Sequence, residues 1–408
     1  MMKSLSQGNK NKYLSIIAKF SRLEGSLNHH SFLIDKLSKN FKEIFIINSE
    51  NLELFSKKKK YNLINAKKKI PSNYTFFDPQ NSKDLSKFLE DKEIVVINFL
   101  ARGFENIRIH YLLKKFKVKQ VLITNHGHVA PTQIIPSKHF FKLLSHFFKY
   151  YFAKKLTLIL SIFGLISKIE IQFLCVKKIV DGFKNSFYKK ALYKNNWLFS
   201  KEYMLVNSMS YDMLMENKFS LCEDYIVHID ASLNYYHEVE LRGRLDKETV
   251  SKHYYYLEKF LKRLSNEFNK EVVVCIHPNY NLEEHQEFFK DFKVIKFKTR
   301  EFIYKSILVT TFDSTAIVDA ILLKKKIIGI ESDFMTRNEI THAKTFAKKG
   351  GYMVLNTKRD YDFNKEKILF QLNQNLSNYD NYISDFHCFE PNISGTNKII
   401  KILKERFF

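Results

Sequence analysis

The sequence predicts an α/β protein in which two Rossmann-like domains face a cleft, the GT-B architecture. Short apolar runs rich in β-branched residues recur along the chain, which is typical of buried parallel strands. They alternate with longer segments whose apolar residues repeat at helical spacing. The chain has 408 residues, of which 45% are hydrophobic, so two domains of ordinary size can each bury a core. We expect a first domain at 1–222 and a second at 223–408.

The second domain is organised around the stretch 271–332. Three apolar runs in it have the length of buried strands, and a helical pattern precedes the last run. The predicted strands are Val272–Ile276, Ile307–Val309 and Ile327–Ile330, and the predicted helix is Ser314–Leu323. Polar residues follow each strand: His277 and Pro278 after the first, Thr310–Thr315 after the second, and Glu331 and Ser332 at the third.

These polar residues predict one shared site. In an open α/β sheet the carboxyl ends of the parallel strands line the ligand crevice. We therefore expect His277 and the hydroxyl groups of Ser314 and Thr315 to converge. The predicted helix, capped by Asp313 or Ser314, would direct its amino end at the same site, and such an end favours a phosphate group.

This pattern also resembles a known family. A His-Pro pair after one strand, and a Ser/Thr pair opening a helix about 37 residues later, resemble the carboxyl-terminal half of bacterial GT-B glycosyltransferases. The resemblance is to the sialyltransferases and Kdo transferases of surface-polysaccharide synthesis, which use CMP-sugars, and CDP-glycerol polymerases show similar patterns. It covers roughly 100 residues. It implies that His277, with Pro278, and the hydroxyls of Ser314 and Thr315 hold the phosphate of a nucleotide-sugar donor.

Other donor-side candidates follow from the same resemblance. The apolar run Tyr225–Asp230 predicts the first strand of the second domain, and in GT-B enzymes the loop after this strand lies beside the donor. Asp230 is therefore a catalytic candidate that faces the sugar. Arg242 is a candidate for offsetting the phosphate charge, because a guanidinium group binds two phosphate oxygens at once. Glu331 begins a loop that is expected to contact the donor.

The first domain is expected to supply the acceptor side. A strand at Tyr13–Phe20 is followed by a predicted loop at 21–30 and then by a helix at Phe32–Phe41. The resemblance implies that this loop faces the cleft, and the alternative is an ordinary surface turn. Its acceptor-side candidates are Glu24, Asn28 and His29.

The general base has two candidates. After the predicted strand Gln120–Thr124 come Asn125, His126, Gly127 and His128, where bacterial sialyltransferases have an acidic pair followed by glycine. This departure either transfers the base role to His126 or indicates a donor other than sialic acid. Histidine suits the role because its usual pKa lies near neutral pH. Asp181, which precedes Gly182, is the second candidate, and His128 is an acceptor-side candidate.

The charge of the chain predicts an anionic partner. Lysine and arginine number 67 against 43 acidic residues, a net charge of +24. A surface of this kind attracts an acidic glycan, anionic lipid or nucleic acid, although a lysine-rich composition alone also produces it. Because no nucleic-acid-binding motif accompanies the charge, we expect no nucleic acid.

A basic, aromatic insert is predicted to be helical at 138–172. Its longest uncharged run, Leu156–Ser167, is too short to cross a bilayer. The insert fits a helix that lies at the surface of an anionic membrane, or an ordinary helical pair over the first sheet. With no signal peptide, we expect a cytoplasmic protein at the inner face of the cell membrane.

No metal or other cofactor is expected. The four cysteines are scattered without a Cys-x-x-Cys pair, which argues against a zinc site or a disulfide framework. The resemblance implies metal-independent transfer, and Asp360-Tyr361-Asp362 is interpreted as a chance match to a metal-binding motif.

The sequence thus predicts an inverting glycosyltransferase that moves sialic acid or Kdo from a CMP-sugar to a capsule, lipooligosaccharide or other surface-glycan acceptor. Two alternatives stay open: the same fold with CDP-glycerol or a UDP- or GDP-sugar as donor, and a non-catalytic, basic polyanion-binding protein.

Overall fold

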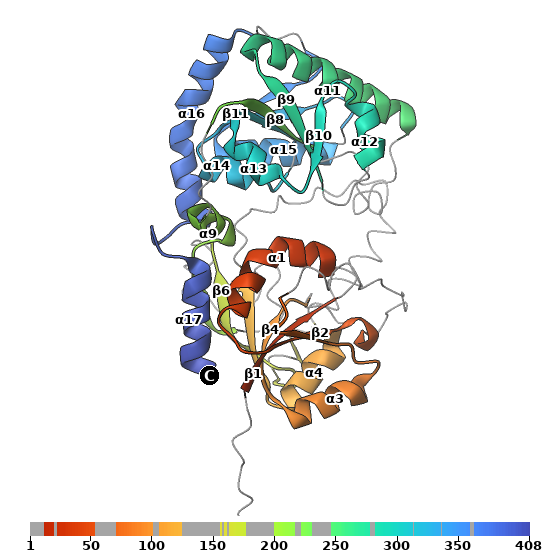
Figure 1. Cartoon of the computed structure of the whole chain (residues 1–408), viewed down its shortest axis with the longest axis vertical. Coiled ribbons are helices and arrows are strands. Elements are labelled where there is room, and N and C mark those ends of the chain that lie inside the picture. The colour runs from red at the N-terminus through yellow and green to blue at the C-terminus, as the bar shows by residue number, and fades with distance from the viewer. Residues whose placement is uncertain are drawn as a thin grey trace, which may run out of the picture. The chain divides into compact units, whose positions relative to one another are not determined.

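The computed structural model of the chain describes residues 12–19, 23–53, 71–100, 106–124, 156, 159–160, 163–176, 200–216, 222–230, 246–277, 282–312, 314–335, 337–359 and 363–408. These residues fall into two compact units (Figure 1). Unit 1 holds the described residues up to Asp212 together with Cys388–Phe408, and unit 2 holds Met213–His387. Each unit is a parallel sheet covered by helices.

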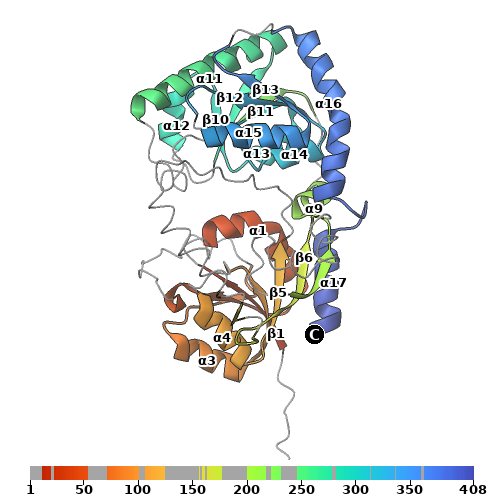
Figure 2. The same ribbon diagram turned by 180° about the vertical axis from the view of Figure 1, so that it is seen from behind.

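Unit 1 contains a seven-stranded sheet in the order β3-β2-β1-β4-β5-β6-β7, with every neighbouring pair parallel. The strands are β1 (Lys12–Ala18), β2 (Ile44–Asn48), β3 (Tyr74–Phe77), β4 (Glu93–Asn98), β5 (Lys119–Thr124), β6 (Ile169–Leu174) and β7 (Ser200–Leu205). The helices are α1 (Leu23–Ser38), the short 3-10 helix η2 (Glu50–Leu52), α3 (Ser82–Asp91), α4 (Ile107–Lys115) and α17 (Gly395–Phe407). Helices α3 and α4 share one buried cluster with β1, β2 and β4, whereas α1 and α17 contact each other away from them (Figures 1 and 2).

Unit 2 contains a six-stranded parallel sheet in the order β10-β9-β8-β11-β12-β13. The strands are β8 (Tyr225–Asp230), β9 (Glu271–Ile276), β10 (Lys293–Lys296), β11 (Ser306–Thr311), β12 (Lys326–Glu331) and β13 (Met353–Asn356). The helices are α11 (Lys247–Phe268), α12 (Leu282–Phe288), α13 (Thr299–Tyr304), α14 (Ile317–Leu322), α15 (Arg337–Gly350) and α16 (Lys365–Phe386). Two buried clusters sandwich the sheet, one under α11 and the other under α13, α14 and α15.

The two sheets share one topology. In each, the chain builds three strands outward in one direction, returns to the middle and then builds outward in the other. The order of strands therefore reverses between β1 and β4 in unit 1 and between β8 and β11 in unit 2. Ligands of open α/β sheets bind at the carboxyl ends of the strands that flank such a switch point.

Several predicted elements differ in the structure. The segment predicted as a loop at 21–30 is largely helical, because α1 begins at Leu23. A single glycine costs only about 1 kcal/mol in a helix, so Gly25 does not prevent it. The last residues of the predicted helical insert belong to β6, which pairs with β5. By contrast, the loop predicted after Glu331 is present in the described residues up to the start of α15 at Arg337.

The carboxyl-terminal segment belongs to unit 1, whereas the sequence-based boundary puts it in the second domain. The buried carboxylate of Asp212 in α9 (Met209–Glu216) accepts hydrogen bonds from Gly395 N at 2.8 Å and Thr396 N at 2.6 Å. A carboxylate at this position satisfies free N–H groups at the start of α17. Asn207 adds hydrogen bonds to the carbonyl oxygens of Glu390 and Ile393.

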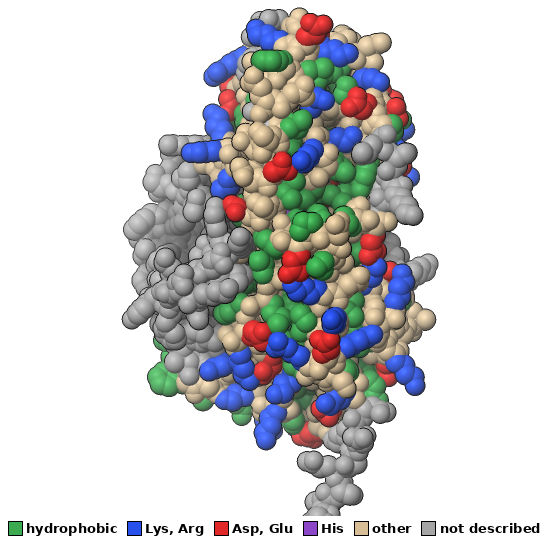
Figure 3. Space-filling model, turned by 90° about the vertical axis from the view of Figure 1, so that its left-hand side faces the viewer, with side chains coloured by type: hydrophobic (Ala, Val, Ile, Leu, Met, Phe, Trp, Pro, Cys, Tyr) green, Lys and Arg blue, Asp and Glu red, His purple; other side chains and the backbone are tan. Residues whose placement is uncertain are grey.

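In each unit, charged side chains of both signs are interspersed over the side drawn in Figure 3. This face is therefore not a single basic patch. Much of the lysine excess lies in sequence outside the described residues, such as 54–70, which has seven lysines and no acidic residue. No helix in the described part of the chain is both long and apolar enough to cross a membrane.

Candidate active site

Three of the predicted site residues lie along the carboxyl edge of the unit 2 sheet. Asp230 is the last residue of β8, and it pairs in register with Ile276 of β9, so His277 follows directly beside it. On the other side of β8, Ile229 pairs with Thr311, which leads into the turn that contains Ser314. The parallel register thus brings Asp230, His277 and Ser314 to the switch point between β8 and β11.

Asp230 is a buried carboxylate surrounded by polar groups. Tyr254 of α11 donates a hydrogen bond to its Oδ2 at 3.3 Å, and His285 Nε2 of α12 lies 3.5 Å from the same oxygen. His228 Nε2 lies 3.9 Å from Oδ1. Burial raises the pKa of Asp230, but the hydrogen bond from His285 and the neighbouring histidines outweigh it, so the pKa is lowered overall. The carboxylate is therefore ionised at neutral pH.

His277 is half-buried and lies within the electrostatic reach of two charged groups. Burial is the main cause that lowers its pKa, Asp230 acts in the opposite direction, and Lys296 at the end of β10 lowers the pKa further. Lys296 pairs in register with Ile276, which explains its effect on the next residue. A neutral imidazole at pH 7 can donate one ring N–H to an anion.

Ser314 and Thr315 open a tight turn rather than a long helix. Three successive hydrogen bonds of the i to i+3 type join 314–316 to 317–319, and α14 begins only at Ile317. The predicted cap by Ser314 is wrong: Ala316 is the N-cap, and Ser314 Oγ accepts a hydrogen bond from Ala316 N at 3.3 Å within the turn. Because α14 has six residues, its dipole is small, so any anion here depends on side-chain donors.

Glu331 ends β12 at the same edge, but its carboxylate is already paired. Lys344 of α15 lies 2.8 Å from Glu331 Oε2. Beside it, Asn356 Nδ2 donates to Asp333 Oδ1 at 2.8 Å. These contacts connect the ends of β12 and β13 and leave Glu331 part of an ion pair.

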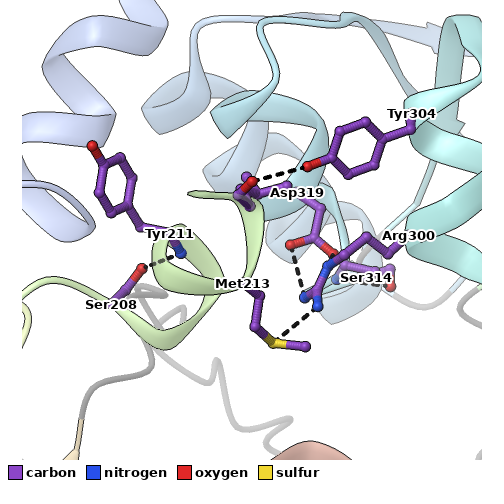
Figure 4. A network of polar contacts seen from close by, with 9 residues as sticks. Ser208, Tyr211, Met213, Arg300, Tyr304, Ser314 and Asp319 are labelled. Atoms are coloured by element: carbon purple, nitrogen blue, oxygen red, sulfur yellow. Dashed lines mark hydrogen bonds and ion pairs between the residues drawn. The ribbon is translucent and has the colours of Figure 1, made fainter. Parts of the chain in front are cut away.

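An ion pair joins α14, the helix that follows the Ser314 turn, to α13 (Figure 4). Arg300 of α13 donates to both carboxylate oxygens of Asp319 in α14, at 2.9 and 3.1 Å. The same guanidinium contacts Met213 Sδ in α9, and Tyr304 donates to the carbonyl oxygen of Leu214. Lys324, which is nearer to Asp319 in the sequence, pairs with Asp380 instead.

The sequence reasoning missed a buried histidine cluster beside Asp230. His228 shares its strand face, and its Nδ1 lies 3.0 Å from Thr310 Oγ1. His253 of α11 is fully buried against Tyr254 and Phe312, and its ring nitrogens make no hydrogen bond to described residues. Burial lowers the pKa of both His228 and His253 to about 4. One signal was available: His228 precedes Asp230 by two residues, which is the spacing of one strand face.

In unit 1 the switch point lies between β1 and β4. Helix α1 follows β1 directly, so its amino end starts at this edge. Near it, Lys19 pairs with Glu53 at 2.5 Å, and Asn98 donates to Gln120 at 2.8 Å. The side chains of Glu24, Asn28 and His29 in α1 are not described. The remaining predicted site residues also lie outside the described residues: His126, His128, Asp181, Arg242, Pro278 and Asp313.

Among the described residues, no group of histidine, cysteine, aspartate and glutamate side chains is arranged to hold a metal ion. The histidine cluster includes only one carboxylate, Asp230. Metal independence stays a prediction.

No protein-family model and no curated protein matches this chain. Solved structures do. The chain is similar to the wall teichoic acid polymerase TagF, in a variant soaked with CDPG, at 10% identity and a TM-score of 0.51, over 96% of this chain and 88% of that one. It is also similar to UDP-GlcNAc 2-epimerase from Methanocaldococcus jannaschii, at 13% identity and a TM-score of 0.51, over 97% and 100% of the two chains. At such identities the likeness shows the fold: the chain is an α/β protein with two Rossmann-like domains, as in GT-B proteins.

Proposed function

We propose that this protein is an inverting glycosyltransferase that uses a nucleotide-activated sugar as donor. One observation carries the proposal: Asp230, His277 and the Ser314 turn meet at the switch point of unit 2, in a protein with the two-Rossmann-domain fold. This edge is where open α/β sheets bind nucleotides. Its polar groups are of the kind that hold a phosphate without a metal.

In the proposed reaction, an acceptor hydroxyl attacks the anomeric carbon of the donor sugar. The bond from that carbon to the phosphate oxygen breaks, and its electron pair leaves with the nucleotide. His277 donates a hydrogen bond to the phosphate, and the hydroxyls of Ser314 and Thr315 add two more. Arg242 offsets the negative charge of the phosphate. Asp230 positions Tyr254 and His285, which lie beside it at the donor site. These groups act most strongly as negative charge builds up on the leaving phosphate.

The reaction also needs a base that takes the proton of the acceptor hydroxyl. We propose His126 for this role, with Asp181 as the other candidate and Glu24, Asn28, His29 and His128 as acceptor-binding residues. The His126→Ala variant should lose activity and the pH dependence that reports the base. The Asp181→Asn variant should keep that pH dependence, and the reverse result would assign the base to Asp181.

For the donor, we propose a CMP-sugar of sialic acid or Kdo. CDP-glycerol is the second candidate donor, because the similar TagF structure was soaked with CDPG. For the acceptor, we propose a surface glycan at the inner face of the cell membrane, where the net charge of +24 would attract acidic groups.

Nucleotide-dependent thermal stabilisation tests the proposal. CMP and CDP should raise the melting temperature, and the His277→Ala and Ser314→Ala variants should lose this effect. In a turnover assay each variant should be roughly 10- to 1000-fold slower, as when a preorganised donor to a developing anion is removed. Ser377→Ala, an exposed serine on α16, is the matched control and should behave as wild type.

Other results have definite meanings. Stabilisation by UDP or GDP but not by CMP or CDP would show that the donor carries a different nucleotide, and the proposed site would stand. Unchanged turnover in folded His277→Ala and Ser314→Ala variants would reject the site. If no nucleotide stabilises the protein but acidic polysaccharides do, the chain is a polyanion-binding protein instead.

A further inference from the structure

One edge of unit 1 exposes apolar and basic side chains together. The described residues 159–160 and 163–165 form a turn beside α4, and the most exposed apolar residue among them is Phe163, with 75% of its surface accessible. Leu165, Tyr111 and Ile159 are also strongly exposed. We name this the Phe163 surface, and its members are Tyr111, Lys114, Ile159, Phe163, Leu165 and Lys168.

The turn that carries Phe163 is a formed structural element. Phe163 N donates to Ile159 O at 2.9 Å, and Leu165 N donates to Leu160 O at 2.8 Å. Gly164 between them has φ +67°, the left-handed conformation that ends a helical turn in the Schellman motif. The backbone therefore holds Phe163 and Leu165 in defined directions.

Neighbouring residues of the turn point inward and anchor it. Ile166 is buried with Leu122 and Ile169, and Leu160 packs against the same cluster. The turn is thus amphipathic: Leu160 and Ile166 face the unit 1 sheet, while Ile159, Phe163 and Leu165 face outward. One face of the turn therefore covers the sheet and the other is exposed.

The cations of α4 lie next to this turn. A Cβ atom on Gly164 would lie 3.4 Å from Lys114 Nζ. The segment 106–124 contains Arg108 and four lysines but no acidic residue, and 159–168 contains Lys168 and no acidic residue. The exposed apolar side chains are therefore bordered by positive charge that no acid in these two segments offsets.

We propose that the Phe163 surface docks this protein onto an anionic lipid bilayer. The apolar side chains enter the boundary between head groups and acyl chains, and the lysines bind the anionic head groups. A second copy of the chain fits less well. A symmetric dimer would bring the same patch from both copies together, so lysines would face lysines.

This inference rests on the proposed function for its biological setting, an acceptor at the membrane, but its test does not need turnover. The full chain is sedimented with vesicles of phosphatidylcholine, with or without phosphatidylglycerol. Wild type should bind only the vesicles that contain phosphatidylglycerol. The Phe163→Ser/Leu165→Ser variant should bind them at least about tenfold more weakly, because two large apolar groups no longer leave water.

Matched controls separate docking from general damage. Phe370→Ser removes another strongly exposed phenylalanine, 65% accessible, from α16 in unit 2 and should bind vesicles as wild type does. Lys114→Glu should weaken binding roughly fivefold or more, and Lys290→Glu, an exposed lysine of unit 2, should have a much smaller effect. Each variant should keep the wild-type melting temperature and nucleotide response, which report folding and the proposed function separately.

Three outcomes would overturn the inference. The first is equal loss of binding in the Phe163 and Phe370 variants. The second is equally strong binding to phosphatidylcholine alone. The third is a dimer in solution that the Phe163→Ser/Leu165→Ser variant dissolves, which would make the patch an interface between copies.

Discussion

The hydroxyl of Tyr254 donates a hydrogen bond to the carboxylate of Asp230 across 3.3 Å, and both side chains are buried. Tyr254 belongs to α11 and Asp230 ends β8, so this bond attaches the longest helix of the β8–β9 connection to the edge of the sheet. A buried carboxylate is tolerated only with such partners, because an isolated buried charge is strongly unfavourable. The bond therefore supports both the stability of unit 2 and the ionisation of Asp230.

Removing either partner should have separable effects. Tyr254→Phe loses one hydrogen bond and should reduce the free energy of unfolding by about 1–2 kcal/mol. Asp230→Asn keeps the shape but loses the charge, so the pKa of His277 should fall further, since Asp230 now raises it. Denaturant unfolding and a nuclear magnetic resonance titration of the histidines measure the two effects. An unchanged His277 titration in Asp230→Asn would show that the two groups do not interact.

Acid should begin to destabilise unit 2 at pH values well above those at which carboxylates usually titrate. The pKa values of His228 and His253 are about 4, below the ordinary 6.5, because burial disfavours the charged imidazole. Their neutral forms stabilise the fold fully above pH 6.5, and this contribution is lost as the pH falls from 6.5 towards 4. Each group contributes up to about 3 kcal/mol. The lowered pKa of Asp230 acts in the same direction at still lower pH.

The His253→Leu variant tests this pH dependence. Leucine fits the buried apolar surroundings of His253 and carries no titratable group. The free energy of unfolding, measured between pH 7 and pH 5, should decline less steeply in this variant than in wild type. Parallel declines in the two proteins would contradict a buried, neutral His253.

The ion pair between Arg300 and Asp319 should be energetically coupled. Both side chains are mostly buried, and the guanidinium binds the carboxylate through two nitrogens. Arg300→Met and Asp319→Asn should each cost about 2–3 kcal/mol, because each leaves a largely buried charge without its partner. The double variant should cost less than the sum of the two. Additive losses in the double-mutant cycle would mean that the pair contributes no interaction energy.

Gly395 should not tolerate a side chain. A Cβ atom there would lie 2.2 Å from the carbonyl oxygen of Asn207, which is backbone and cannot rotate away. Gly395→Ala should therefore displace the start of α17 from Asp212 and cost about 1–3 kcal/mol. Thermal unfolding of this variant is compared with Lys401→Ala, an exposed change in the same helix that should stay within about 0.5 kcal/mol of wild type. Equal melting temperatures would show that α17 can detach without cost.

Parts of the fold followed directly from local patterns. The strand Tyr225–Asp230 was predicted to the residue, since a parallel strand buried on both faces has a strong signal. Short or mixed segments were missed: β3, β10 and α13 have four to six residues each, too few for a clear period. The helices α3 and α16 were missed because the sequence in and around them is mostly polar.

The candidate site divides in the same way. His277, Ser314 and Asp230 were identified because parallel strands place their carboxyl ends at one edge, which is a property of the backbone that sequence reveals. The histidines around Asp230 come from α11, α12 and β8, and the partner of Asp319 comes from α13. No local pattern records such contacts, because they depend on how helices pack across the sheet. The sequence alone thus determined the strands that carry these three residues and the edge of the sheet at which they gather. Only the tertiary structure decided which groups are buried together, and burial is what sets the charge of Asp230, His228 and His253.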